Sequence, residues 1–215
     1  MKDLYSKENS FFIRIFNKNK LDIGHKNSLF ISKIDDLEEA IKKTIAENKI
    51  EKIIFLGAAF LTQSDFFIRM KEDDIDNLLS VNILNYVKIT KILLPFMIEK
   101  RNGNIVYLSS FRSSVTSRGI SLYSASKSFG ESFFEVIGKE YGAIGVYSTS
   151  IRMGYFDGRM TLDQPRDKLK AIKLNSGNRR LGSPSDLIEA INFVLKNPYT
   201  NGGVIDLHGG INHEF

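Results

Sequence analysis

The sequence has no cysteine, few prolines and no long hydrophobic run, and each absence excludes a class of protein. Without cysteine the chain forms neither a disulfide framework nor a thiolate metal site, which fits a reducing compartment. The four prolines are scattered and mark no linker, so residues 1–215 are expected to form a single domain. The most strongly apolar run, Ile53–Leu61, is far shorter than the roughly 20 residues of a membrane-spanning helix.

Neither the N-terminal segment nor the net charge points to a membrane or to nucleic acid. The sequence FFIRIF is short and has Arg14 in its centre, so it does not resemble a signal peptide. The formal net charge of +5 comes from dispersed basic residues, with only short clusters such as Lys42-Lys43 and Arg179-Arg180. We therefore expect a cytoplasmic protein whose partners are anionic small molecules or an acidic protein rather than nucleic acid or a membrane.

Strand-like and helix-like segments alternate along the chain, which indicates an α/β fold with a parallel sheet. The expected strands are residues 11–16, 28–31, 52–55, 104–108, 146–152 and 203–207, and the expected helices are residues 35–48, 73–99, 123–141 and 184–196. Small or polar residues follow three of these strands, at 57–59, 109–110 and 153–154. Ligands of open α/β sheets bind at such strand ends, so the functional site is expected there.

The sequence YSASK, from Tyr123 to Lys127, carries the chemistry of the chain. A tyrosine and a lysine four positions apart lie one above the other on a helix face. The tyrosine hydroxyl has an ordinary pKa of about 10, and an ammonium group one turn away favours the phenolate and lowers that pKa. Such a pair can protonate a carbonyl oxygen. The pattern alone is weak, because an ordinary aromatic and a solvated lysine give the same letters.

Five motifs are spaced along residues 28–212. They are VN at Val81-Asn82, NIVYLSS ending at Ser110, YSASK, RLGSPSDL from Arg180, and NGGVIDLHGG near the C-terminus. Ser110 precedes Tyr123 by 13 residues. In this combination and spacing the chain resembles the short-chain dehydrogenase/reductase family, and within it the 3-oxoacyl carrier-protein reductase type. The resemblance implies a Rossmann-like, doubly wound parallel sheet and an NAD(P)-dependent oxidoreductase.

The resemblance also implies roles for four side chains. Tyr123 would be the general acid and base, Lys127 would hold the cofactor ribose, and Ser110 would hydrogen-bond the substrate oxygen. Asn82 would interrupt its helix and seat a water molecule in a proton relay. Each residue taken singly is compatible with an ordinary structural role, whereas all four in register favour the catalytic interpretation.

The N-terminal region departs from the family pattern. Family members bind the dinucleotide pyrophosphate on a glycine-rich turn, TGxxxGxG, where backbone N–H groups and a helix dipole face the phosphates. Here the only glycine before Gly57 is Gly24, and only 27 residues precede Ser28. We therefore expect the first βα unit to be reduced or missing, with residues 1–27 forming an atypical N-terminus.

Other cofactor positions are changed as well. The acidic residue that contacts the adenine aligns with Ser32, the sequence LGAA replaces the NNAG turn, and Met153-Gly154 stands where the family has PG. Gly57 and Ala58 are small enough for a ligand to approach the backbone closely. The resemblance thus implies that NADP or NAD contacts Ser32, Gly57, Ala58, Tyr123, Lys127 and Gly154.

Residues 154–180 resemble the substrate lid of the family. Their basic side chains suit an anionic substrate or an acidic carrier protein, although a solvated charged helix gives the same pattern; they are Lys168, Lys170, Lys173, Arg179 and Arg180. The three histidines lack the spacing of a metal site, so no metal is expected. The resemblance also implies a homodimer or homotetramer joined through residues 73–99 and 123–141.

Three functions stay open on the sequence alone. The first is an NAD(P)H-dependent carbonyl reductase, or ketoreductase. The second is a non-redox enzyme that uses Tyr123 and Lys127 for dehydration, isomerisation or cyclisation. The third is a partner subunit of a complete homologue. Retention of all four catalytic residues favours the reductase, and the missing glycine-rich turn is its weak point.

Overall fold

The computed structural model describes residues 12–15, 28–31, 37–47, 52–57 and 65–211. Four parallel strands form the main sheet in the order β3-β4-β5-β6, where β3 is Ile53–Gly57, β4 is Gly103–Ser110, β5 is Val146–Met153 and β6 is Val204–Leu207. A second sheet pairs β1 (Phe12–Ile15) with β2 (Ser28–Ile31), also in parallel. The expected α/β class with a parallel sheet is confirmed.

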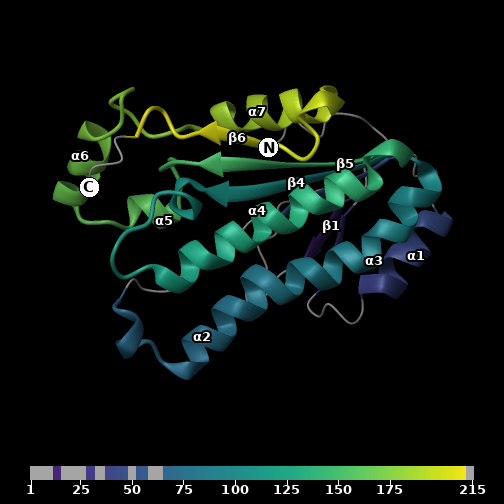
Figure 1. The fold of residues 1–215 in the computed structure, drawn as a ribbon, viewed down its shortest axis with the longest axis horizontal. Coiled ribbons are helices and arrows are strands. Elements are labelled where there is room, and N and C mark those ends of the chain that lie inside the picture. The colour runs from purple at the N-terminus through teal and green to yellow at the C-terminus, as the bar shows by residue number, and fades with distance from the viewer. Residues whose placement is uncertain (1–11, 16–27, 32–36, 48–51, 58–64, 212–215) are drawn as a thin grey trace.

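Helices cover both faces of the main sheet, as a doubly wound fold requires (Figure 1). One face carries α1 (Leu37–Glu47), α2 (Glu72–Leu79), the single π-helical turn η4 (Ser80–Leu84), α3 (Asn85–Lys100) and α4 (Ser121–Tyr141). The opposite face carries α7 (Pro184–Lys196). Two short helices, α5 (Arg159–Leu162) and α6 (Arg166–Leu174), lie in the segment that resembles a lid.

The core under α3 and α4 is built around aromatic rings. The ring of Tyr107, on β4, lies 5.4 Å from that of Tyr86 and 5.1 Å from that of Phe134, measured between centroids. All three side chains are buried. Gly130 makes room for this packing, because a Cβ there would lie 2.2 Å from Cζ of Tyr107. The helix α4 can therefore approach β4 closely and hold its N-terminal residues at the end of that strand.

The core under α7 is smaller and aliphatic. Val106 and Ile151 project from β4 and β5 toward Ile191 and Val194 of the helix. Neighbouring residues of β4 alternate between the two cores because successive side chains of a strand point to opposite faces. The helix begins with a capping box, in which the Ser183 backbone N–H donates to a carboxylate oxygen of Asp186 at 2.7 Å.

The helical stretch Glu72–Lys100 is long and apolar enough, by length and composition alone, to cross a membrane. Its inward side nevertheless packs on the sheet, where Asn82, Tyr86 and Met97 are buried. A buried asparagine and a tyrosine in an aromatic cluster are typical of a core helix. We therefore describe this stretch as part of the α/β core.

Two predictions concern the N-terminal half of the chain. The expected helix over residues 73–99 contains a π turn at Ser80–Leu84, which inserts one residue into the regular α-helical ladder and includes Asn82, the residue expected to interrupt this helix. The expected reduction of the first βα unit concerns residues 1–27, of which the structure describes only Phe12–Ile15 of β1, so this expectation stays a prediction.

Candidate active site

The four predicted catalytic residues come together at the end of β4. Ser110 is the last residue of that strand, and Tyr123 and Lys127 occupy successive turns at the start of α4. Asn82 lies in the π turn, fully buried, where its Nδ2 donates to Oγ of Ser126 at 3.1 Å. The hydroxyl of Ser126 in turn donates to the backbone carbonyl of Tyr123 at 2.7 Å. Asn82 thus fixes the first turn of α4 from the neighbouring helix.

The pKa of the Tyr123 hydroxyl lies above its ordinary value. Burial raises the pKa of this tyrosine because it disfavours the phenolate, and the hydrogen bond with Ser110 opposes that effect. The nearby Tyr155 raises the pKa further, whereas the charge of Arg112 lowers it. The net direction is upward, so the expectation that Lys127 brings the pKa of Tyr123 below its ordinary value is wrong for this structure. Burial, which the spacing of YSASK does not reveal, outweighs the neighbouring charges.

Lys127 is itself buried, and this changes its charge. Its Nζ donates to the carbonyl oxygen of Leu108 at 2.6 Å and lies 5.0 Å from the ring centroid of Tyr107. Burial lowers the pKa of Lys127 to about 7, and the negative charge of Glu131 partly opposes this shift. An ammonium group has three donors, and Leu108 is its one hydrogen-bond acceptor in the described part of the chain. The remaining donors fit the hydroxyl groups of a ribose.

A polar network lies one helical turn beyond Lys127. The carboxylate of Glu131 accepts hydrogen bonds from Oγ of Ser109 at 2.5 Å and Oγ of Ser113 at 2.6 Å. Arg152, on β5, donates to the same carboxylate through Nε at 3.1 Å and Nη2 at 2.9 Å. Burial acts to raise the pKa of Glu131, but these hydrogen bonds outweigh it and hold the pKa below its ordinary value.

Two further residues near Ser110 were not predicted from the sequence. The backbone N–H of Arg112 donates to Oγ of Ser110 at 3.2 Å, and its Nη2 donates to the hydroxyl of Tyr155 at 3.1 Å. The guanidinium carbon lies 4.4 Å from the ring centroid of Phe111, and that ring packs against Tyr155. Of Glu131, Arg152, Arg112 and Tyr155, only Glu131 could have been identified from the sequence. It follows Lys127 by one helical turn on the same face of α4.

The predicted cofactor contacts are only partly within reach. Ser32 and Ala58 lie outside the described residues. Gly57 ends β3, but a Cβ at this position would lie 2.6 Å from Cε1 of Tyr86. The glycine therefore gives room to the ring of Tyr86, and its predicted contact with a ligand stays a prediction.

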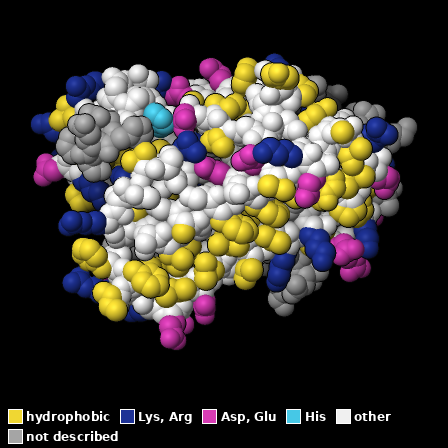
Figure 2. Space-filling model, viewed as in Figure 1, with side chains coloured by type: hydrophobic (Ala, Val, Ile, Leu, Met, Phe, Trp, Pro, Cys, Tyr) yellow, Lys and Arg dark blue, Asp and Glu magenta, His cyan; other side chains and the backbone are white. Residues whose placement is uncertain are grey.

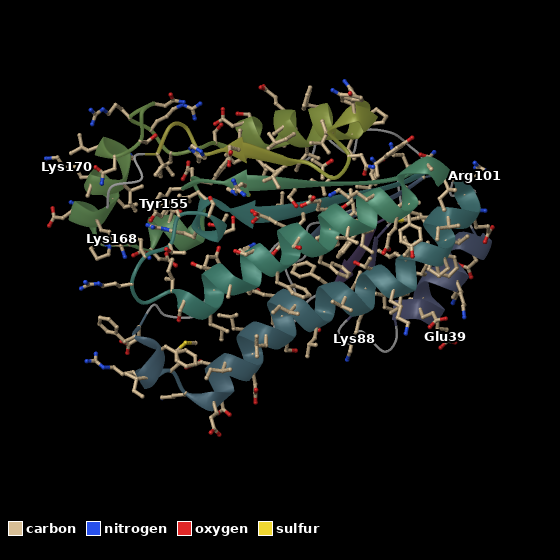
Figure 3. All side chains as sticks on the ribbon, viewed as in Figure 1. Glu39, Lys88, Arg101, Tyr155, Lys168 and Lys170 are labelled. Atoms are coloured by element: carbon tan, nitrogen blue, oxygen red, sulfur yellow. The ribbon has the colours of Figure 1, made fainter. Side chains whose placement is uncertain are left out.

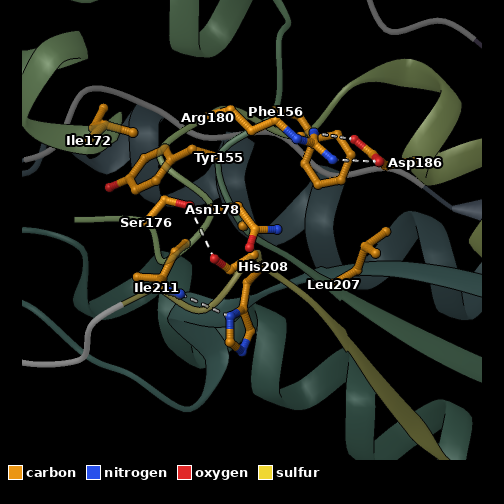
Figure 4. A pocket seen from close by; sticks show the side chains of 13 residues that line it. Tyr155, Phe156, Ile172, Ser176, Asn178, Arg180, Asp186, Leu207, His208 and Ile211 are labelled. Carbon is orange, nitrogen blue, oxygen red and sulfur yellow. Dashed lines mark hydrogen bonds and ion pairs between the residues drawn. The ribbon is translucent and has the colours of Figure 1, made fainter. Parts of the chain in front are cut away.

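Gly154 borders a cavity of about 90 Å³ between the lid segment and the chain after β6 (Figure 4). A Cβ at Gly154 would lie 2.8 Å from Cα of His208, so the glycine permits close packing of these two segments. The cavity is lined by aromatic, polar and charged side chains; those labelled in the figure include Tyr155, Phe156, Ser176, Asn178, Arg180 and Asp186.

The basic side chains of the lid segment are exposed. Lys168 and Lys170 of α6 project away from the body of the molecule (Figure 3). Arg180 differs from them because its Nη1 lies 2.6 Å from a carboxylate oxygen of Asp186, and the arginine keeps the pKa of that carboxyl well below its ordinary range. No group of three or more His, Asp or Glu residues that could hold a metal occurs within the described ranges.

Known proteins match this chain over most of its length. The family model described as short chain dehydrogenase matches residues 28–169. The chain is 28% identical over 183 residues to carbonyl reductase family member 4 of Xenopus laevis, covering 84% of this chain and 75% of that protein. It is 26% identical over 180 residues to the 3-oxoacyl-[acyl-carrier-protein] reductase FabG of Thermotoga maritima, covering 82% and 72%.

The match and the geometry agree on the same residues. The family model covers the strand that ends in Ser110 and the helix that carries Tyr123 and Lys127, which the structure brings together. It also extends over more than half of the sequence. The chain belongs to the short-chain dehydrogenase family of oxidoreductases.

Proposed function

We propose that this protein is an NAD(P)H-dependent reductase of a small carbonyl compound. The observation that carries the proposal is the buried Lys127, held on the carbonyl oxygen of Leu108 one turn from Tyr123, with Ser110 at the end of the same strand close enough to lower the pKa of that tyrosine. A carbonyl oxygen placed at Ser110 and Tyr123 accepts hydrogen bonds from both hydroxyl groups. With a pKa at or above the ordinary value of about 10, the hydroxyl of Tyr123 carries its proton at neutral pH and can donate it to the oxygen on reduction.

The described residues fit the ribose end of a nicotinamide cofactor. Lys127 has donors to spare beside Tyr123, with its Nζ at 5.9 Å from the ring centroid of the tyrosine. Bound NADPH or NADH would supply the hydride to the carbonyl carbon and become oxidised, while Tyr123 gives its proton to the oxygen. The phenolate that remains is then reprotonated, and Lys127, with a pKa of about 7, is a suitable proton donor next to it.

Cofactor binding and proton transfer are tested separately. We would titrate the full chain with NADPH and then NADH by calorimetry, and measure ketone reduction from the loss of nicotinamide absorbance. Tyr123→Phe is expected to bind the same cofactor and to lose turnover by roughly 10²- to 10⁴-fold. No binding at millimolar concentration would overturn the reductase, and full activity of Tyr123→Phe would overturn the role of the tyrosine.

A second candidate is a proton-transfer enzyme that needs no hydride. It is favoured by the near-neutral pKa of Lys127, since a lysine that titrates near neutral pH can both accept and donate a proton. The discriminating measurement is deuterium exchange at the carbon next to a ketone, in D₂O and without added nicotinamide. Exchange that Tyr123→Phe abolishes would support this candidate over the reductase.

We propose in addition that the protein is cytoplasmic and forms a homodimer or homotetramer through the outer face of α2, α3 and α4. Figure 2 shows hydrophobic side chains gathered in a band over these helices. Leu84, Phe129 and Val136 are 52%, 39% and 47% exposed, and Phe129 stacks on Phe133 at 5.8 Å. Val136→Glu is expected to yield monomers in light scattering, whereas a monomeric wild type would contradict this interface.

The alternative to a small free substrate is a carrier-linked ketone. The Thermotoga maritima relative is named as a reductase of an acyl-carrier-protein substrate. Here the exposed Lys168, Lys170 and Lys173 of α6 offer positive charge to an acidic carrier. Reversal of these three charges is expected to weaken binding of a carrier-linked ketone and to leave that of a small free ketone unchanged.

A further inference from the structure

Arg112 is a half-buried arginine without an acidic partner among the described residues. Arg152 pairs with Glu131 and Arg180 pairs with Asp186, but no carboxylate in the described ranges lies within 4.0 Å of Arg112. Its guanidinium has five N–H donors, of which Nη2 donates to the hydroxyl of Tyr155. Donors therefore remain for another group.

The guanidinium is held in place rather than free in solvent. It lies 4.4 Å from the centroid of the Phe111 ring, and Phe111 is buried. The ring of Tyr155 packs against Phe111 at 5.3 Å between centroids. A charged group that is fixed and partly desolvated binds an opposite charge more strongly than an exposed one, because less water competes for it.

The location of this arginine relates it to the reacting atoms. Its backbone N–H donates to Oγ of Ser110, and the Ser110 side chain lowers the pKa of Tyr123. The electrostatic influence of both Arg112 and Tyr155 reaches the hydroxyl of Tyr123. A substrate with its carbonyl oxygen at Ser110 and Tyr123 therefore lies within the electrostatic reach of a cation that has no carboxylate partner among the described residues.

We propose that Arg112 and Tyr155 form a subsite for a carboxylate next to the carbonyl, so that the preferred substrate is a keto acid. A carboxylate matches the planar fork of a guanidinium and accepts two parallel hydrogen bonds from it. The hydroxyl of Tyr155 accepts from Arg112, so its own proton is left to donate to the same carboxylate. Arg112 is in this sense a specificity-determining residue, and the proposal rests on the proposed function only for the placement of the carbonyl.

Binding of matched ligands tests the subsite without requiring turnover. The probes are 2-oxobutanoate and 3-oxobutanoate, each compared with its methyl ester, titrated into the full chain with and without nicotinamide cofactor. The acid of at least one pair is expected to bind roughly 10- to 100-fold more tightly than its ester, as charge-assisted hydrogen bonds imply. Equal affinity of acid and ester in both pairs, or no binding of either acid at tens of millimolar, would overturn the subsite.

Variants at two arginines assign the preference to Arg112. Arg112→Gln is expected to bind the ester as the wild type does and to lose the advantage of the acid, and Arg112→Lys to keep part of it. Arg118 is exposed on the same loop, so Arg118→Gln removes one solvent-exposed charge and should leave the preference intact. If Arg118→Gln abolishes the preference as fully as Arg112→Gln, general attraction of anions explains it and the subsite is refuted.

The outcomes also separate the subsite from the proposed reductase. Selective binding of a keto acid that no cofactor reduces would retain the subsite and remove the reductase. Reduction of neutral ketones with no preference for the acid would retain the reductase and remove the subsite.

Discussion

The hydrophobic cores on the two faces of the main sheet differ in size, in the type of side chain that fills them and in their distance along the fold from the candidate catalytic residues. The face under α3 and α4 is filled by the rings of Tyr86, Tyr107 and Phe134, whereas aliphatic side chains fill the face under α7. All four residues of the candidate catalytic group lie on β4, η4 or α4, and none lies on α7. The geometry of the site therefore depends mainly on how the aromatic core places α4.

The sharpest test compares large truncations on the two faces. Phe134→Ala is expected to lower the free energy of unfolding by about 3–5 kcal/mol, and Ile191→Ala by about 2–5 kcal/mol, since both side chains are buried. Urea denaturation measures both losses. Activity per folded molecule should fall only in Phe134→Ala, and equal losses of activity would break the distinction between the faces.

A smaller effect is expected from adding a single methyl group. Gly130→Ala would place a Cβ 2.2 Å from Cζ of the buried Tyr107, so we expect a loss of about 1–3 kcal/mol in the free energy of unfolding. Gly158→Ala is the matched control, because nothing lies within 4 Å of its Cβ. A Gly130→Ala variant as stable as Gly158→Ala would show that α4 can move away from the sheet.

The buried lysine predicts how stability changes with pH. The pKa of Lys127 falls from 10.5 to about 7 on folding, so between these values the unfolded chain binds a proton that the folded chain does not. The wild type should gain stability relative to Lys127→Met as pH rises from 7 to 10, by at most about 1.4 kcal/mol per pH unit. Below pH 7 the difference should be flat.

Denaturation of both proteins in urea at pH 6, 7, 8 and 9 measures this difference. Lys139→Met, at an exposed position of the same helix, is the control for loss of a lysine. A difference between wild type and Lys127→Met that does not change above pH 7 would contradict the burial of the ammonium group.

The smallest expected effect concerns Glu131. Its negative charge raises the pKa of Lys127, so Glu131→Gln should lower that pKa further. If turnover needs the ammonium form, the loss of activity at alkaline pH should begin at lower pH in Glu131→Gln, and kcat at pH 8 should fall more than kcat at pH 6. The control is Glu135→Gln on the same helix, and identical pH profiles of the two variants would remove Glu131 from the site.

The sequence predicted the elements near the site better than their electrostatics. The strand ending at Ser110 and the helix from Tyr123 were placed within a few residues, because hydrophobic periodicity and strand ends are local signals. The direction in which the pKa of Tyr123 shifts was predicted wrongly, because the burial of this side chain depends on segments that are distant in the sequence. Arg152 forms a hydrogen bond with Glu131, which is 21 residues away in the sequence, and no local pattern predicts such a contact.

The cofactor positions were harder still to predict. Gly57 was expected to let a ligand approach the backbone closely because it is small, and the structure shows that it also makes room for the ring of Tyr86. Its predicted contact with a ligand stays a prediction. Ser32 and Ala58 stay predictions, because they lie outside the described residues. A single sequence shows that a residue is small but not which neighbour uses the room.

The π turn at Ser80–Leu84 has a consequence for helix phase. Each residue of an α-helix turns the chain by about 100°, so one inserted residue rotates α2 against α3 by about that angle. Removal of any single residue between Ser80 and Leu84 would restore a regular helix and yet turn one of the two helices away from the sheet. The number of residues in this turn, as much as their identity, aligns Asn82 with Ser126.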